Sequence, residues 1–249
     1  MNENKQTKTV KMYEKLWDDF DNDFVEQATK DLEMRFIRNR LSFTMLTNKL
    51  VLDMGCGSGR NSVALKRLGA REVIGIDLND TERFKYPNVV YKKGNVLEMP
   101  YKDNMFDFVF CNGVLLHTTD PNKGIKEIYR VLKPGGKAWL YVVGECQFWK
   151  DVERIRTKID DYDRESLIKI LKISDFPVNK TFFILDIFGV PIMKYYKKDE
   201  LERLFIKIGF KDYQYLERGL DYNMSEKQYR KVSGFEYGFN GDLRYILTK

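Results

Sequence analysis

Residues 51–62, VLDMGCGSGRNS, decide the fold that this sequence predicts. An apolar run ends at Asp53, glycines follow at Gly55, Gly57 and Gly59, and a helix begins after them. A strand that turns sharply into a helix presents free backbone N–H groups, and glycine lets a ligand approach that backbone closely. The stretch therefore predicts a ligand site at the carboxyl end of an early strand.

Apolar strands and helices alternate along the middle of the chain. Because the strands are almost wholly apolar, they predict an α/β fold with a parallel sheet and helices on both of its faces. Ligands bind at the carboxyl edge of such sheets, where Asp53, Asp77, Asn95 and Asn112 are expected to converge. Strands are expected at 49–55, 72–78, 89–95, 106–115 and 137–144, and helices at 58–68 and 120–132.

The flanking segments predict additions to this sheet. From Val10 to Phe36 the apolar residues recur at steps of three and four, which indicates one or two amphipathic helices. Residues 146–196 are expected to be mostly helical. Residues 210–218 and 243–249 are expected to form an antiparallel pair of strands.

Composition and charge exclude several classes of protein. The 249 residues are 43% hydrophobic and 32% charged, which is enough apolar content for a packed core. The formal charge of +6 comes from interleaved acids and bases, so a solvated surface is expected. Neither a secretory leader nor a membrane-spanning run is predicted. Three cysteines and one histidine have no metal-binding spacing, so we expect no metal site, reduced thiols and a cytoplasmic location.

The glycine spacing distinguishes two kinds of nucleotide-binding loop. In the dinucleotide fingerprint G-x-G-x-x-G the third glycine would fall on Arg60, whereas the spacing here is G-x-G-x-G with Asp53 two residues ahead of it. This spacing resembles motif I of the class I S-adenosylmethionine-dependent methyltransferases. Three further segments are similar to that family in the same order, namely GNVLEMPYKDNMFDFV, FCNGVLLHTTDP and IKEIYRVLKPGGKAWL. The resemblance covers residues 49–144 and is closest to the small-molecule subgroup that contains ubiquinone and menaquinone methyltransferases.

The resemblance implies a fold and a division into domains. The implied fold is the Rossmann-like class I methyltransferase fold, with helices on both faces of a mostly parallel seven-stranded sheet. It includes an antiparallel C-terminal strand and a helical lid insertion after strand five. The expected domains are an N-terminal helical cap over 1–48, a cofactor-binding core over 49–145, a lid or substrate insertion over 146–196 and completion of the core sheet over 197–249.

The resemblance also implies which residues bind S-adenosylmethionine and its product S-adenosylhomocysteine. Asp77 stands where the family holds the ribose hydroxyls with an acid, since a carboxylate can accept both O–H donors. Asn95 is a departure, because the family commonly has Asp there; Asn can accept a hydrogen bond from the adenine amino group, but without charge. The expected cofactor-binding residues are Asp53, Gly55, Cys56, Gly57, Asp77, Leu78, Asn95, Val96 and Asn112.

Catalytic and acceptor-binding residues are less strongly marked. His117 follows strand four on the crevice side and is the candidate general base, with a capping or loop role as the alternative. Aromatic residues of the N-terminal helix and of the insertion are expected either to cover the acceptor or to form the lid's own core. The expected lid and substrate residues are Tyr13, Trp17, Phe148, Trp149, Phe182, Phe183, Phe188 and Tyr195.

The implied reaction is in-line transfer of the sulfonium methyl group to an oxygen, nitrogen or carbon atom of a small molecule. One alternative is an RNA or protein methyltransferase, which the basic charge and clusters such as KYYKK at 194–198 favour. A second is a cofactor-binding scaffold protein without turnover. No [DN]PP[YF] sequence follows strand four, and no separate basic module with interleaved aromatic residues is present, so a nucleic-acid partner is not expected. The oligomeric state and the acceptor are left open.

Overall fold

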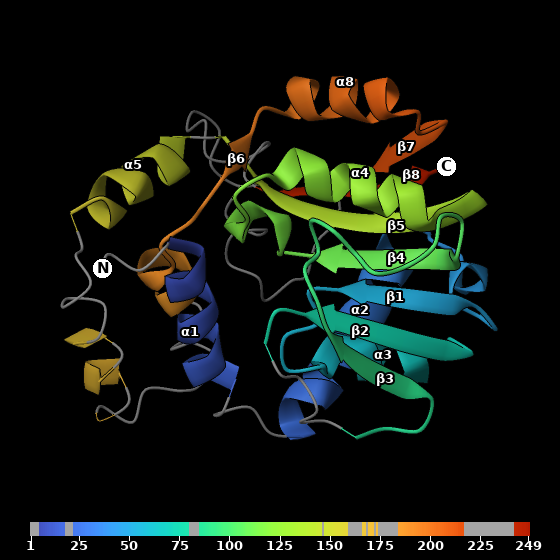
Figure 1. The fold of residues 1–249 in the computed structure, drawn as a ribbon, viewed down its shortest axis with the longest axis horizontal. Helices are drawn as coiled ribbons and strands as arrows, with labels where there is room; N and C mark the ends of the chain where they lie inside the picture. Colours follow the sequence, from blue (N-terminus) through green and yellow to red (C-terminus); the bar gives the residue numbers. More distant parts are fainter. Residues whose placement is uncertain are drawn as a thin grey trace.

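The structure, a computed structural model, contains one sheet with helices on both faces (Figure 1). Within the described residues the strand order is β3-β2-β1-β4-β5-β8-β7, and the short β6 pairs with β5. No helix among these residues has both the length and the apolar character needed to cross a membrane. The described residues are 5–17, 22–79, 85–145, 147–158, 166–167, 169–171, 173, 184–216 and 242–249.

The sheet is parallel except at one strand near its end. Strand β8 runs antiparallel to both of its neighbours, β5 and β7, and the other pairings are parallel. The predicted α/β fold with an antiparallel C-terminal strand is therefore confirmed, and β6 adds a two-residue strand to the seven expected. The strands are β1 Leu50–Met54, β2 Glu72–Asp77, β3 Val89–Lys93, β4 Phe106–Asn112, β5 Leu132–Gly144, β6 Tyr195–Tyr196, β7 Asp212–Tyr215 and β8 Asp242–Thr248.

Two helix boundaries follow directly from local chemistry. The Asp120 side chain accepts a hydrogen bond from the backbone N–H of Lys123, and Pro121 occupies the first turn, where its missing N–H costs nothing. Gly209 ends another helix with a φ of +114°. The α-helices are α1 Lys5–Trp17, α2 Asn22–Arg38, α3 Arg60–Arg67, α4 Pro121–Val131, α5 Gln147–Arg156 and α8 Lys198–Ile208. The shorter helices are η1 Phe43–Met45, η2 Leu115–His117 and the π-helical η3 Leu185–Gly189.

Alternate residues of the strands face two separate core layers. In β1, Leu52 and Met54 pack in the layer that contains residues of α4 and α8, whereas Val51 packs in the layer that contains residues of α2 and α3. All three side chains are fully buried. Burial of a side chain of this size stabilises the fold by roughly 1.5–3 kcal/mol, so the two layers hold the carboxyl end of β1 firmly in place.

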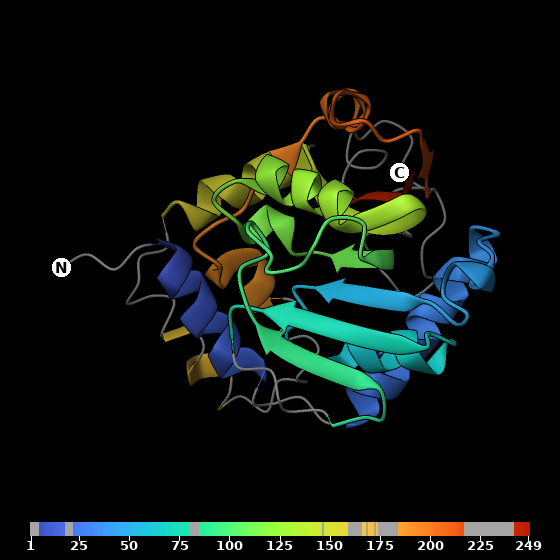
Figure 2. The same ribbon diagram turned by 45° about the vertical axis from the view of Figure 1, so that its right-hand side comes forward.

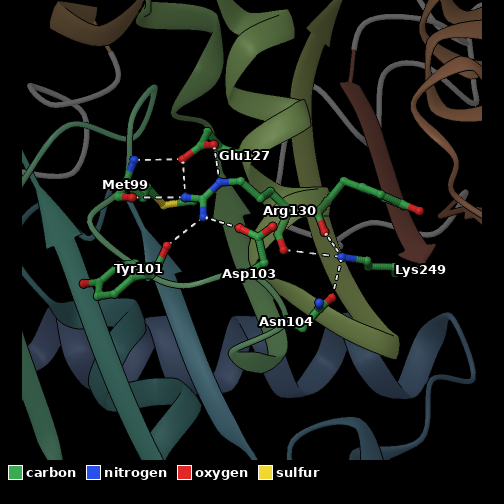
Figure 3. Close-up of polar contacts among 8 residues, drawn as sticks. Met99, Tyr101, Asp103, Asn104, Glu127, Arg130 and Lys249 are labelled. Carbon is green, nitrogen blue, oxygen red and sulfur yellow. Dashed lines mark hydrogen bonds and ion pairs between the residues drawn. The ribbon is translucent and has the colours of Figure 1, made fainter.

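A charged network holds the loop after β3 against α4 (Figure 3). Arg130 donates hydrogen bonds to the carbonyl oxygens of Met99 and Tyr101 at 3.0 and 2.7 Å. It also donates to the carboxylates of Glu127 and Asp103. Glu127 in turn accepts the backbone N–H of Met99 at 2.8 Å. The loop is therefore fixed by main-chain contacts on both sides of Pro100.

Helix α1 lies opposite the carboxyl ends of the strands. Figures 1 and 2 both show α1, in dark blue, on the side toward which the arrowheads of β1, β2 and β4 point. Met12 of α1 packs in one cluster with Leu185 of η3 and Val190, which follows it. Of the two N-terminal helices, α2 belongs to a sheet layer and α1 to the cover of the carboxyl edge.

Candidate functional site

A cavity of about 290 Å³ lies at the carboxyl edge of the sheet. Its wall comes from the loops after β3, β2, β1 and β4, with Tyr141 of β5 at one end. Four strand spacings separate β3 from β5, so the cavity can extend for about 19 Å along this edge. Ten residues expected from the sequence line it, namely Tyr13, Gly55, Cys56, Gly57, Asp77, Leu78, Asn95, Val96, Asn112 and His117.

The glycine turn brings bare main chain to the cavity wall. Gly55 has a φ of +77°, and a Cβ placed there would lie 2.4 Å from a methyl carbon of Val114, so no larger residue fits. Gly57 has a φ of +52° and lines the cavity. Gly59 serves packing instead, since a Cβ there would lie 2.3 Å from the hydroxyl oxygen of Tyr91. The three glycines therefore have two different roles.

Asp77 joins the end of β2 to the glycine turn. One carboxylate oxygen accepts the backbone N–H of Gly57 at 2.9 Å, and the other accepts that of Asn79 at 3.1 Å. Burial raises the pKa of Asp77, and hydrogen bonds from backbone N–H groups oppose that rise. An acceptor-only group thus stands on the cavity wall beside the glycines.

The two asparagines are held by side-chain hydrogen bonds. The Asn95 side-chain oxygen accepts the backbone N–H of Leu97 at 2.9 Å, which orients the residue after β3. The Asn112 oxygen accepts the indole N–H of Trp139 at 3.0 Å. An amide oxygen has two lone pairs, so each of these oxygens retains capacity for a further donor.

Asp53 lies behind the wall rather than on it. Its side chain is buried, and it accepts a hydrogen bond from the Ser62 hydroxyl at 2.6 Å. Burial raises the pKa of Asp53 to about 7, against the lowering effects of the Ser62 hydrogen bond and the Arg60 charge. Among the residues expected to bind cofactor, Asp53 is the one that does not line the cavity.

Three polar side chains from distant segments meet at the β4 end of the cavity. The Tyr13 hydroxyl donates to an oxygen of Asp186 at 2.5 Å, and the same oxygen lies 3.5 Å from Nε2 of His117. The rings of Tyr13 and His117 meet edge to face at 5.5 Å. Burial raises the pKa of Tyr13 well above its usual value, and the Asp186 charge adds to that rise. Tyr13, Asp186 and His117 therefore form one polar cluster at this end of the cavity.

Sequence reasoning did not assign a function to Asp186, Arg60 or Tyr141, all of which line the cavity. A signal for Asp186 was present, because it is an acid that interrupts the apolar stretch FFILDIFGVPIM. Arg60 follows directly after the glycine motif, and burial lowers its pKa while nearby acids oppose the shift. The hydroxyl of Tyr141 donates to Asp242 at 3.0 Å.

Apart from Tyr13, the described aromatic residues expected in the lid lie outside this cavity. Trp149 and Tyr195 line a second cavity of about 490 Å³, and the Tyr195 hydroxyl donates to Glu153 there at 2.9 Å. Phe188 packs against the cluster that contains Trp149. The side chains of Trp17 and Phe148 and the residues Phe182 and Phe183 lie outside the described part of the chain.

The core of the chain matches a known protein family. Residues 52–140 match a family described as a methyltransferase domain. The core belongs to the class I S-adenosylmethionine-dependent methyltransferases. This methyltransferase core includes Asp77 and His117, but neither Tyr13 nor Asp186.

Curated relatives match over a similar length. The tRNA U34 carboxymethyltransferase of Campylobacter hominis is 34% identical over 106 residues, which are 39% of this chain and 37% of that protein. The demethylmenaquinone methyltransferase of Lactiplantibacillus plantarum is 37% identical over 105 residues, which are 37% of this chain and 44% of that protein. The chain thus spans less than half the length of each of these two relatives.

A solved structure shares the whole fold. It is the 1,6-didemethyltoxoflavin-N1-methyltransferase of Burkholderia thailandensis, with 1,6-didemethyltoxoflavin and S-adenosylhomocysteine bound. The similarity covers 98% of this chain and 86% of that one, with a TM-score of 0.55 at 17% identity. At this identity the similarity shows the fold alone, and it confirms the class I methyltransferase fold.

Proposed function

We propose that this chain transfers a methyl group from S-adenosylmethionine to a small-molecule acceptor. The observation that carries the proposal is the cavity along the carboxyl edge, with bare glycine main chain and Asp77 in its wall. A Cβ at Gly55 would collide with Val114, so this turn depends on glycine, and Gly57, with a φ of +52°, lines the cavity. These residues fit a nucleoside cofactor.

Each part of the cavity would hold one part of the cofactor. Asp77 would accept hydrogen bonds from the ribose hydroxyls, and Asn95 and Val96 would bracket the adenine. The glycine turn and Asn112 would hold the methionine part beside β4. When bound, the cofactor supplies a methyl group that is already activated by a positively charged sulfur. The chain's own residues need to align the acceptor and exclude water, and alignment alone can supply roughly 7–11 kcal/mol.

The cover of the cavity favours a small acceptor. Gln6, Thr9, Val10 and Tyr13 place α1 across the opening, and the Tyr13–Asp186 hydrogen bond ties α1 to η3. The volume of about 290 Å³ is just below the usual range for small-molecule sites, roughly 300–1,000 Å³. A structured RNA would require this cover to open.

An RNA acceptor is the second candidate, because the Campylobacter hominis relative is named as acting on tRNA. The formal charge of +6 is also compatible with a polyanion. The dependence of acceptor binding on salt concentration distinguishes a small-molecule acceptor from RNA. Binding of a polyanion weakens steeply as ionic strength rises, whereas binding of an uncharged small molecule barely changes.

Calorimetric titration of S-adenosylhomocysteine into the purified chain tests the cofactor site. We expect Asp77→Ala to weaken binding by about 1.5–3 kcal/mol, or roughly 10- to 150-fold, the range for a hydrogen bond to a charged group. Asp77→Asn, which keeps one acceptor oxygen, is the second variant to measure if Asp77→Ala does not fold. Asp199→Ala, which removes an exposed acid on α8, is the control and should bind normally. Equal affinities for all variants would show that the nucleoside does not contact Asp77.

Radiolabelled S-adenosylmethionine then tests the acceptor class. Label transferred to low-molecular-weight compounds in a cell extract supports the proposal. Transfer to tRNA instead would assign the second candidate. Cofactor binding without any transfer, over both pools and a broad acceptor panel, would support the scaffold alternative.

A further inference from the structure

We propose that Asp186 and His117 form the group that accepts a proton from the methyl acceptor. The acceptor is then methylated at a hydroxyl or an amine that gives up a proton during the reaction. This inference rests on the proposed function, because it names the chemistry at the acceptor end of the same cavity.

The tautomer of His117 is set by a main-chain contact. Its Nδ1 lies 2.9 Å from the carbonyl oxygen of Ile192. A carbonyl oxygen only accepts hydrogen bonds, so Nδ1 must carry the proton and donate. In the neutral ring Nε2 is then the basic nitrogen, and it faces the cavity side.

Asp186 stands directly in front of that basic nitrogen. Its oxygen lies 3.5 Å from Nε2, which is longer than an ordinary hydrogen bond. With Asp186 ionised and His117 neutral, two acceptor atoms face each other with no proton between them. One added proton turns this arrangement into an ion pair, so the pair is built to take up a proton.

The surrounding groups keep Asp186 ionised and in place. Burial would raise the pKa of Asp186, but the hydrogen bond and positive charge of His117 once its ring is protonated, the hydrogen bond from Tyr13 and the charge of Arg156 hold it below the usual value. Arg156 of α5 also donates to the carbonyl oxygens of Ile187 and Val190, which fixes η3. Asp77, across the cavity, adds a further negative charge that acts on Tyr13.

The two members of the pair differ in their access to an acceptor. The Asp186 side chain is 31% exposed and the His117 side chain is 7% exposed, although both line the cavity. Asp186 is therefore the member that contacts the acceptor, and His117 lies behind it. This order is the reverse of the Ser-His-Asp arrangement, in which the imidazole touches the reacting group and the carboxylate stabilises the charge that forms on it. Here the carboxylate would touch the acceptor, and the imidazole behind it would take up the proton.

The proton balance of the step is complete. The acceptor's O–H or N–H donates to Asp186 while its lone pair forms the new bond to the methyl carbon. The methyl–sulfur bond breaks, and its electron pair stays on sulfur. The acceptor proton passes to Asp186 and is shared with Nε2 of His117. Release to solvent after the product leaves restores the pair, and neither an oxidant nor a reductant is required.

A single histidine makes the pair directly observable, because nitrogen-15 NMR of the imidazole ring reports on one residue. We expect Nδ1 to carry the ring proton and Nε2 to carry none in the neutral ring, which the two nitrogen-15 chemical shifts distinguish. Asp186→Asn should change the Nε2 shift, because an amide replaces the carboxylate that faces this nitrogen, and should leave Nδ1 protonated. Asp199→Asn is the control and should leave both shifts unchanged. A bare Nδ1, or equal Nε2 shifts in the wild-type protein and Asp186→Asn, would overturn the proposal.

Two further measurements separate this inference from the proposed function. S-adenosylhomocysteine should bind Asp186→Asn with nearly wild-type affinity, which also shows that the variant is folded. If the wild-type protein fails to bind S-adenosylhomocysteine, the proposed function fails while the NMR result still stands. With labelled cofactor and a panel of phenols, primary amines and thioethers, we expect Asp186→Asn to lose roughly 10²- to 10⁴-fold in rate on the protic acceptors. Transfer to thioethers alone, at equal rates in both proteins, would refute the proton-accepting role.

Discussion

The buried carboxyl group of Asp53 should make the stability of the chain fall as pH rises. Burial raises its pKa from the ordinary 3.8 to about 7. Between these values the folded chain holds a proton that the unfolded chain has lost, so the free energy of unfolding decreases as pH increases. The shift of about three pH units, at 1.36 kcal/mol each, gives an upper limit of about 4 kcal/mol.

Asp53→Asn removes this dependence while keeping the side-chain size and an acceptor for the Ser62 hydroxyl. We expect the variant to match the wild-type protein near pH 4 and to be more stable by up to about 4 kcal/mol near pH 8. Urea unfolding followed by circular dichroism at a series of pH values measures the difference. Contributions shared by both proteins, such as the other carboxylates, cancel in that difference.

Asp107→Asn is the control, because the pKa of Asp107 is shifted in the opposite direction to that of Asp53. Burial pushes the pKa of Asp107 up, but hydrogen bonds from Lys133 and the backbone N–H of Leu50 hold it below its usual value. Its contribution to stability is present above the ordinary pKa and is lost as pH falls through the lowered one. Asp107→Asn should therefore destabilise the chain at neutral pH. A stability gain for Asp53→Asn that does not change with pH would refute the assigned burial of the charge.

Two further predictions concern the loop after β3 and the glycine turn. Arg130→Met should destabilise the chain by about 2–4 kcal/mol in urea unfolding, because it removes donors from two carbonyl groups and the positive charge beside Glu127. Arg154→Met, which removes an exposed pair with Asp151, should cost at most about 1 kcal/mol. Gly57→Val should abolish S-adenosylhomocysteine binding in calorimetry, because the new side chain enters the cavity. Gly135→Val is the control, because Gly135 also has a left-handed φ and a Cβ there would meet no atom within 4 Å. This variant should lose about 1–2 kcal/mol of folding stability and bind S-adenosylhomocysteine normally. An equal loss of binding in both variants would show that backbone strain causes the defect.

The cofactor end of the site could be predicted because its information is local. Gly55 and Gly57 are adjacent to the strand that positions them, and Asp77 is the last residue of its own strand. Parallel strands place such residues at one edge whatever the rest of the chain does. Asp53 lies behind the cavity wall, which the sequence pattern could not show, because it does not reveal whether an acid at the end of a strand faces the cavity or the layer behind it.

The acceptor end required the three-dimensional structure, because its parts come from segments that no motif connects. Tyr13 and Asp186 are 173 positions apart, and His117 reaches Ile192 across 75 positions. Asp186 also lies on a π-helix, in which residues on the same face are not spaced by the three or four positions of an α-helix. A search for α-helical periodicity therefore does not place Asp186 on the cavity side. The matched family segment, residues 52–140, contains His117 but neither of its partners. Relatives named for tRNA and for demethylmenaquinone match 39% and 37% of this chain. Because the matched segment contains most of the residues that we propose to bind the cofactor, we expect the choice of acceptor to depend on what lies outside it, and in this chain Tyr13 and Asp186 lie outside it.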